Sequence, residues 1–122
     1  VSVVGINVVR NKKDQEDIVH RLAGSTAAYV GIPDDIPKDA VNCLDAYLGP
    51  GYSLPTPEMA EAVRLVARTE GILLDPCYTG KAMAGLLDLV RKDFFRKEDR
   101  VLFLHTGGIP ALYAHGSEIL DS

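Results

Sequence analysis

The sequence has no massed basic residues and no excess of positive charge. Lys and Arg number 13 against 17 Asp and Glu, and the net charge is −4. The densest basic stretch, Arg91 to Arg100, carries three acids among its five bases. Because phosphate contacts need gathered Lys and Arg, we expect no nucleic-acid partner.

Long apolar runs and paired cysteines are missing as well. No run approaches the roughly 18 residues of a membrane span, and nothing resembles a secretory signal, so we expect no membrane partner. Cys43 and Cys77 form no CxxC motif, which is typical of a cytoplasmic chain with reduced thiols. Histidines with i,i+4 partners or nearby cysteines are also absent, so we expect no metal site; the three are His20, His105 and His115.

What is present is an alternation of strand-like and helix-like segments within 122 residues, the size of one domain or part of one. Predicted strands span Val1 to Val9, Ala40 to Leu48, Ile72 to Asp75 and Arg100 to His105. Predicted helices follow the caps Asn11, Thr56 and Thr79, the third running to about Phe94, and a last one starts at Pro110. The alternation predicts an α/β fold, with a mainly parallel sheet and helices on both faces.

Ligands of such sheets bind at the carboxyl ends of the strands, where three loops qualify: Gly49–Pro55, Asp75–Lys81 and His105–Pro110. Gly80-Lys81 suggests a phosphate loop, but GxxxxGK[ST] needs a glycine in place of Asp75 and a hydroxyl residue in place of Ala82. A GxGxxG fingerprint is absent as well. The sequence therefore indicates no nucleotide loop of either kind.

Polar side chains on these three loops leave two interpretations open. Thr106-Gly107-Gly108 can bring backbone amides and a hydroxyl to a ligand, or it can be a turn that lets the next helix pack. Tyr52 and Tyr78 can stack on a flat ring, donate a proton, or simply pack. Composition and spacing lead only to an α/β segment with a polar rim.

The order of the motifs adds a resemblance. DPCYTGKAMAGL, from Asp75, and HTGGIPAL, from His105, fit the blocks DPxYxGKxMxGL and HxGGxPAL. The chain, over nearly its whole length, resembles the pyridoxal-phosphate enzymes of the 1-aminocyclopropane-1-carboxylate deaminase and D-cysteine desulfhydrase family, which have the tryptophan-synthase-β-like fold, or fold type II. The resemblance implies pyridoxal 5′-phosphate as cofactor, an amino acid as substrate and a homodimer.

Residues 1–122 then look like the carboxyl-terminal portion of the large, cofactor-binding domain. The family's cofactor-binding lysine, asparagine loop and glycine-rich phosphate loop are expected upstream of Val1. Lys81 is accordingly not expected to bind the cofactor; we expect it to pair with a nearby acid or to be solvated at the helix end. By itself the segment is expected to be inactive.

The resemblance also implies roles for five residues. Tyr78 matches the tyrosine near the pyridoxal ring and substrate, and Tyr52 a second active-site tyrosine. Thr79 and Thr106 match the positions that face the pyridine nitrogen, and Gly107 shapes the loop there.

The two threonines distinguish branches of the family. Its ring-opening deaminases resemble one another in having glutamate and leucine at these positions. A neutral hydroxyl leaves the pyridine mostly unprotonated, a weaker electron sink that suffices for α,β-elimination. The implied reaction is conversion of D-cysteine to pyruvate, hydrogen sulfide and ammonia. Ring opening of the cyclopropane substrate, elimination of sulfite from cysteate, and an inactive assembly module remain the alternatives.

Overall fold

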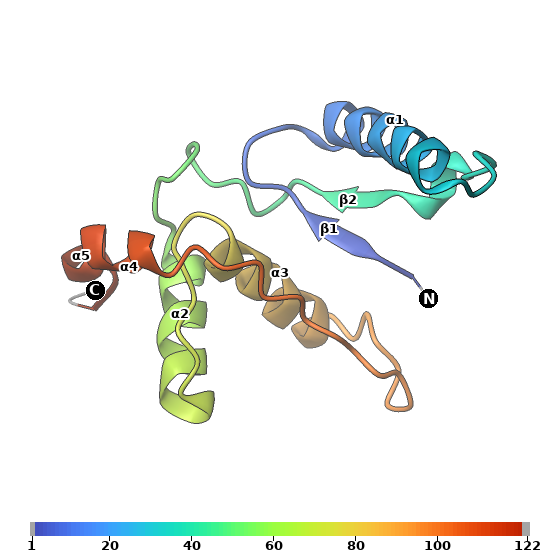
Figure 1. Ribbon diagram of the computed structural model, residues 1–122. Coiled ribbons are helices and arrows are strands. Elements are labelled where there is room, and N and C mark those ends of the chain that lie inside the picture. Colours follow the sequence, from blue (N-terminus) through green and yellow to red (C-terminus); the bar gives the residue numbers. More distant parts are fainter. Residues whose placement is uncertain (1, 121–122) are drawn as a thin grey trace.

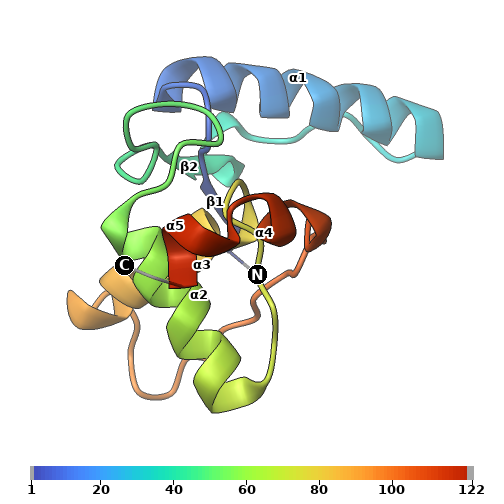
Figure 2. The ribbon, with the colours of Figure 1, turned by 90° about the vertical axis from the view of Figure 1, so that its left-hand side faces the viewer.

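The structure, a computed structural model, describes residues 2–120 without the side chains of Glu118 and Leu120. Its sheet has two strands, β1 (Val4–Ile6) and β2 (Asn42–Leu44), paired in parallel with Gly5 opposite Cys43. Helix α1 (Lys12–Val30) and the short 3-10 helix η1 (Lys38–Ala40) connect the strands. Helix α1 lies on one side of the sheet and α3 (Thr79–Arg91) on the other (Figure 1, Figure 2). The α/β class and the parallel pairing are confirmed.

Two helix starts follow the predicted capping. The Asn11 side chain accepts a hydrogen bond from Asp14 N at the start of α1. The Thr56 side chain does the same for Met59 N at the start of α2 (Pro57–Glu70), whose first residue is a proline. The last described residues form two short helices, α4 (Pro110–Ala114), which starts at the predicted proline, and α5 (Gly116–Leu120).

Two predicted strands are wrong. Residues 72–75 and 100–105 form no strand, because a strand needs a hydrogen-bonded partner and neither segment pairs with another in the described part of the chain. The two segments are joined instead through a side chain, since His105 Nε2 lies 2.9 Å from the carbonyl oxygen of Leu73. Leu102 and Leu104 are exposed. The predicted strand Val1 to Val9 shortens to β1, and Val1 lies outside the described residues.

Helix α3 begins differently from the prediction, because Thr79 is its first residue and not its cap. The N-cap position is Tyr78, whose side chain makes no capping bond, and the Asp75 carboxylate binds the N–H groups there instead. Asp75 is fully buried, and its carboxylate accepts from the backbone N–H groups of Cys77, Tyr78 and Thr79 at 2.7–2.8 Å. The Thr79 hydroxyl donates to the same carboxylate and accepts from Asp75 N. Burial raises the pKa of the Asp75 carboxyl, but these hydrogen bonds together hold the pKa below its ordinary value.

The largest group of buried apolar residues lies where α2 packs against α3 and the carboxyl-terminal segment. It comprises Met59, Ala60, Val63, Val66, Leu74 and Ile119. Gly80 lets the first turn of α3 lie close to the preceding backbone, since a Cβ there would lie 2.6 Å from the carbonyl oxygen of Asp75. None of the helices in the described part of the chain has both the length and the hydropathy that crossing a membrane requires.

A second contact joins α3 to the sheet. A Cβ at Gly85 would lie 2.8 Å from Ile6 on β1, so the helix and strand meet closely there. Beside it, the Tyr47 hydroxyl donates to the Asp88 carboxylate at 2.6 Å. Burial and then this carboxylate raise the pKa of Tyr47 to about 12.

We expect Asp75→Asn to lower the free energy of unfolding of the full-length protein by about 2 kcal/mol, because an amide cannot accept all four hydrogen bonds. Urea unfolding measures the difference. Asp99→Asn is the matched control: Asp99 also accepts from a backbone N–H, that of Arg96, but at an exposed turn. A loss for Asp75→Asn no larger than that for Asp99→Asn would contradict this account of the cap.

The Tyr47–Asp88 contact predicts a loss of stability in alkali. Because folding raises the pKa of Tyr47 from 10.0 to about 12, the contact's contribution is complete below pH 10 and is lost as the pH rises towards 12. The deficit in unfolding free energy of Tyr47→Phe relative to wild type should therefore be constant up to pH 10 and shrink above it. Tyr29→Phe, at an exposed position, should show no such change. A deficit that does not vary with pH would refute the prediction.

Candidate active site

Two tyrosines from separate segments meet at one point. Tyr52 belongs to the loop between β2 and α2, and Tyr78 immediately precedes α3. Their hydroxyl groups are hydrogen-bonded to each other, and the rings stand edge to face with centroids 6.0 Å apart. Both remain partly exposed, at 52% and 43%. The shared hydrogen bond, more than burial, raises the pKa of Tyr52 above its ordinary value.

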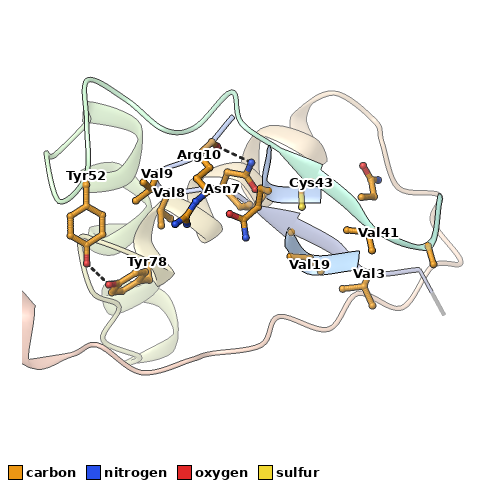
Figure 3. Close-up of a pocket in the computed structure, with 15 residues that line it drawn as sticks. Val3, Asn7, Val8, Val9, Arg10, Val19, Val41, Cys43, Tyr52 and Tyr78 are labelled. Carbon is orange, nitrogen blue, oxygen red and sulfur yellow. Dashed lines mark hydrogen bonds between the residues drawn. The ribbon is translucent and has the colours of Figure 1, made fainter. Parts of the chain in front are cut away.

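The tyrosine pair closes one end of a cavity of about 530 Å³ (Figure 3). The cavity follows β1 and its continuation, with Asn7, Val8, Val9 and Arg10 along it, and reaches Val3 and Val41 at the far end. Asn7 is buried and donates to the carbonyl oxygen of Arg10 at 3.0 Å, which fixes the turn after β1. Volumes of about 300–1,000 Å³ with few polar groups are typical of small-molecule sites.

The two threonines are placed differently. Thr79 is buried, and its hydroxyl donates to Asp75, as described above. Thr106 is exposed, and its hydroxyl makes no hydrogen bond within residues 2–120. Thr79 therefore has to turn its hydroxyl proton away from Asp75 before it can donate to any ligand, whereas Thr106 does not.

The loop that carries Thr106 and Gly107 is held against the start of α3. His105 accepts from Gly107 N at Nδ1, so its Nε2 is the nitrogen that donates to Leu73 O. Gly107 and Gly108 both have positive φ, at 96° and 89°. A Cβ at Gly108 would lie 2.7 Å from the carboxyl carbon of Asp75. The structure thus brings this loop to Asp75, three residues from Tyr78.

The expectation that Lys81 pairs with an acid or is solvated at the helix end is wrong. It is 1% exposed, it forms no salt bridge with the described acids, and its ammonium donates to the carbonyl oxygens of Leu48 at 2.6 Å and Gly51 at 3.0 Å. A signal for this burial was present, since Lys81, Ala84 and Gly85 are spaced to share one helix face and two of them are small. Lys81 is also absent from the lining of the cavity beside the tyrosines.

Metal-binding groups do not form in this region. Among the residues that the structure describes, no three His, Cys, Asp or Glu side chains gather closely enough to hold a metal ion. Cys43 and Cys77 are both buried free thiols.

Known proteins are similar to this chain in sequence and in structure. The D-cysteine desulfhydrase of Yersinia pestis (strain Pestoides F) is 41% identical over 117 residues, which are 96% of this chain and 35% of that protein. The D-cysteine desulfhydrase of Yersinia enterocolitica (serotype O:8 / biotype 1B) is 42% identical over the same shares. A crystal structure of an "ACC deaminase homologue" superposes with a TM-score of 0.84 at 35% identity, over 99% of this chain and 35% of that one.

The chain thus spans about a third of the length of these relatives. Residues 1–107 match the protein family described as "Pyridoxal-phosphate dependent enzyme". This match covers most of the chain and agrees with the superposition, so the chain belongs to the family of pyridoxal-phosphate dependent enzymes.

Proposed function

We propose that the full-length protein is a pyridoxal-phosphate dependent lyase that converts D-cysteine and water to pyruvate, hydrogen sulfide and ammonia. In this reaction the α-proton and the β-carbon–sulfur bond of the substrate are lost, and water replaces nitrogen at the α-carbon. Residues 1–122 would form the carboxyl-terminal portion of its large domain. The observation that carries the proposal is the 41–42% identity, across 96% of the chain, with relatives that are named D-cysteine desulfhydrases.

The cavity fits one side of the cofactor. It has room for a small flat ring, apolar walls, and phenols at one end that can stack against a ring or donate to it. No lysine lines it among the described residues, so the covalent link to the cofactor has to come from another part of the protein. Bound pyridoxal phosphate would supply the electron sink that stabilises charge at the substrate's α-carbon.

The tyrosine pair supplies a proton in this proposal. The hydrogen bond between Tyr52 and Tyr78 leaves one phenolic proton shared and the other free to point into the cavity. That bond raises the pKa of Tyr52 above its ordinary value, which already lies well above neutral pH, so in this proposal the pair acts as a proton donor. The proton can then be donated to the departing sulfur, while Tyr78 contacts the substrate.

The neutral residues at positions 79 and 106 support elimination over ring opening. We propose that Thr106, with its free hydroxyl on the loop shaped by Gly107, faces the pyridine nitrogen. We propose that Thr79 does the same once its hydroxyl proton has turned away from the Asp75 carboxylate. Neither can hold a proton on that nitrogen as a carboxylate would. The nearest alternative is cleavage of the cyclopropane substrate, for which the likeness to an ACC deaminase homologue is the supporting observation. A homodimer in the cytoplasm is part of the proposal, on the resemblance to the family alone.

The full-length protein with pyridoxal phosphate should release sulfide and pyruvate from D-cysteine, and no 2-oxobutyrate from 1-aminocyclopropane-1-carboxylate. Both substrates should be assayed in parallel, with sulfide, pyruvate and 2-oxobutyrate followed separately. Cysteate should be a third substrate, with sulfite as the product to detect. Formation of 2-oxobutyrate, or sulfite without sulfide, would replace the proposed activity by the corresponding alternative.

Tyr78→Phe should lower kcat/KM for D-cysteine by about 10²-fold or more, because it removes a proton donor from the reacting groups. Cofactor loading, measured by the visible absorbance of bound pyridoxal phosphate, should stay at the wild-type level. Tyr29→Phe is the matched control, since Tyr29 is 92% exposed at the end of α1. Equal activity of the two variants would exclude a catalytic role for the Tyr78 hydroxyl.

A further inference from the structure

The loop that carries Tyr52 has little secondary structure to hold it. Residues 49–53 form turns, and just after them the Leu54 N–H donates back to Gly51 O at 3.3 Å. Ser53 adopts a positive φ of 59°, which is unfavourable for a residue with a side chain. Leu54 and Tyr52 are about half exposed. A loop of this kind takes its position from contacts made by other segments.

Lys81 contacts this loop at two points, Leu48 and Gly51. Its ammonium donates to the carbonyl oxygens of Leu48 and Gly51, and Gly51 is bonded directly to Tyr52. Gly49, between the two acceptors, has a φ of 69°, and a Cβ there would lie 2.4 Å from Thr56 Cγ2. The loop therefore closes around the ammonium and packs against Thr56, the N-cap residue of α2.

Lys81 is also rigidly connected to the other tyrosine. It is the third residue of α3 and follows Tyr78 by three positions, and the Tyr78 N–H is held by the buried Asp75 carboxylate. A further link comes from the same segment, because Cys77 Sγ lies 3.0 Å from Ser53 Oγ. One short stretch of chain therefore fixes Tyr78 and, through Lys81 and Cys77, the loop of Tyr52.

The desolvation cost of the Lys81 ammonium argues against a purely stabilising role for this side chain. A buried ammonium without a carboxylate carries a desolvation cost, and burial accordingly lowers the pKa of Lys81. An unbranched apolar side chain of similar length fills the same space without that cost. Such a side chain cannot, however, donate to the two carbonyl groups, which would turn to solvent and release the loop.

We propose that Lys81 is a positioning residue, whose ammonium group, through the carbonyls of Leu48 and Gly51, holds the Tyr52 loop where the two tyrosine hydroxyls meet. The catalytic consequence rests on the function proposed above, since it requires the tyrosine pair to act on the substrate. The hold on the loop does not depend on that function and is measured separately.

The first measurement is amide hydrogen exchange across residues 48–55 of the full-length protein, without substrate. Lys81→Met should make exchange there at least about tenfold faster, because two charge-assisted hydrogen bonds that close the loop are lost. Lys92→Met is the matched control, a lysine beyond the end of the same helix that pairs with Asp88 at the surface. It should leave exchange in this stretch unchanged.

The second measurement is a double-mutant cycle on kcat/KM for D-cysteine. Misplacing a catalytic group by about 1 Å can cost on the order of 10²-fold, and we expect a loss of that order for Lys81→Met. In a Tyr52→Phe background the same substitution should lower kcat/KM by no more than about twofold, because the group that it displaces is already absent. The urea midpoint of Lys81→Met should stay close to that of wild type. A merely structural lysine would lower the midpoint and give independent, multiplicative losses in the cycle.

Lys81→Gln provides a second variant if Lys81→Met does not fold, since its amide still donates to one carbonyl and intermediate exchange is expected. Unchanged exchange at residues 48–55 in a folded Lys81 variant would overturn the inference, as would multiplicative losses in the cycle. Faster exchange with full activity of both Lys81→Met and Tyr52→Phe would support the hold on the loop, and would overturn the catalytic role of the tyrosine pair instead.

Discussion

The structure around the candidate site depends on one buried carboxylate. Asp75 accepts hydrogen bonds from three successive backbone N–H groups and from the Thr79 hydroxyl, and so fixes both the start of α3 and the orientation of Tyr78. The glycine loop after residue 105 is shaped by the same group, because Gly108 lies against it without room for a side chain. Two of the three loops at the rim are therefore organised by a residue that contacts neither the cavity nor solvent.

The third loop is attached to this centre by two polar contacts of different kinds. Lys81 holds it by charge-assisted hydrogen bonds to main-chain carbonyls, and Cys77 by a thiol–hydroxyl contact. Both residues lie on the segment that Asp75 caps. The hydroxyl contact between the tyrosines is thus the end of a chain of contacts that starts at a buried acid. We therefore expect a displacement at any of these contacts to change the distance between the two phenols.

Much of this arrangement could be predicted from the sequence, for reasons that particular residues illustrate. Asn11 and Thr56 directly precede their helices, and the side chain of each accepts from the N–H three residues later, as local capping preferences predict. At the third helix a stronger acceptor, Asp75, lies four residues before Thr79, and a carboxylate accepts more hydrogen bonds than a hydroxyl. Residues 72–75 and 100–105 have the composition of strands, but pairing depends on partners that local sequence does not specify.

The candidate site likewise has parts that could be predicted from the sequence and parts that could not. The predicted loop positions placed Tyr52, Tyr78, Thr79 and Thr106 on one rim, and the structure brings the two tyrosines into contact. The burial of Lys81 was missed because lysine is almost never fully buried. Only the small residues one turn later on its helix face, Ala84 and Gly85, indicated otherwise.

The capping of α3 has a consequence for how the protein binds anions. The start of a helix is ordinarily an attractive place for a phosphate group, because its first N–H groups are unpaired and carry partial positive charge. Here the N–H groups of Cys77, Tyr78 and Thr79 donate to the internal Asp75 carboxylate, whose negative charge also complements the helix dipole at that end. The N–H group of Gly80 donates to the carbonyl oxygen of Asp75. The glycine–lysine pair that follows, despite its likeness to a phosphate loop, therefore presents no free anion site. In the function proposed above, we therefore expect the phosphate of the cofactor to be bound by other residues.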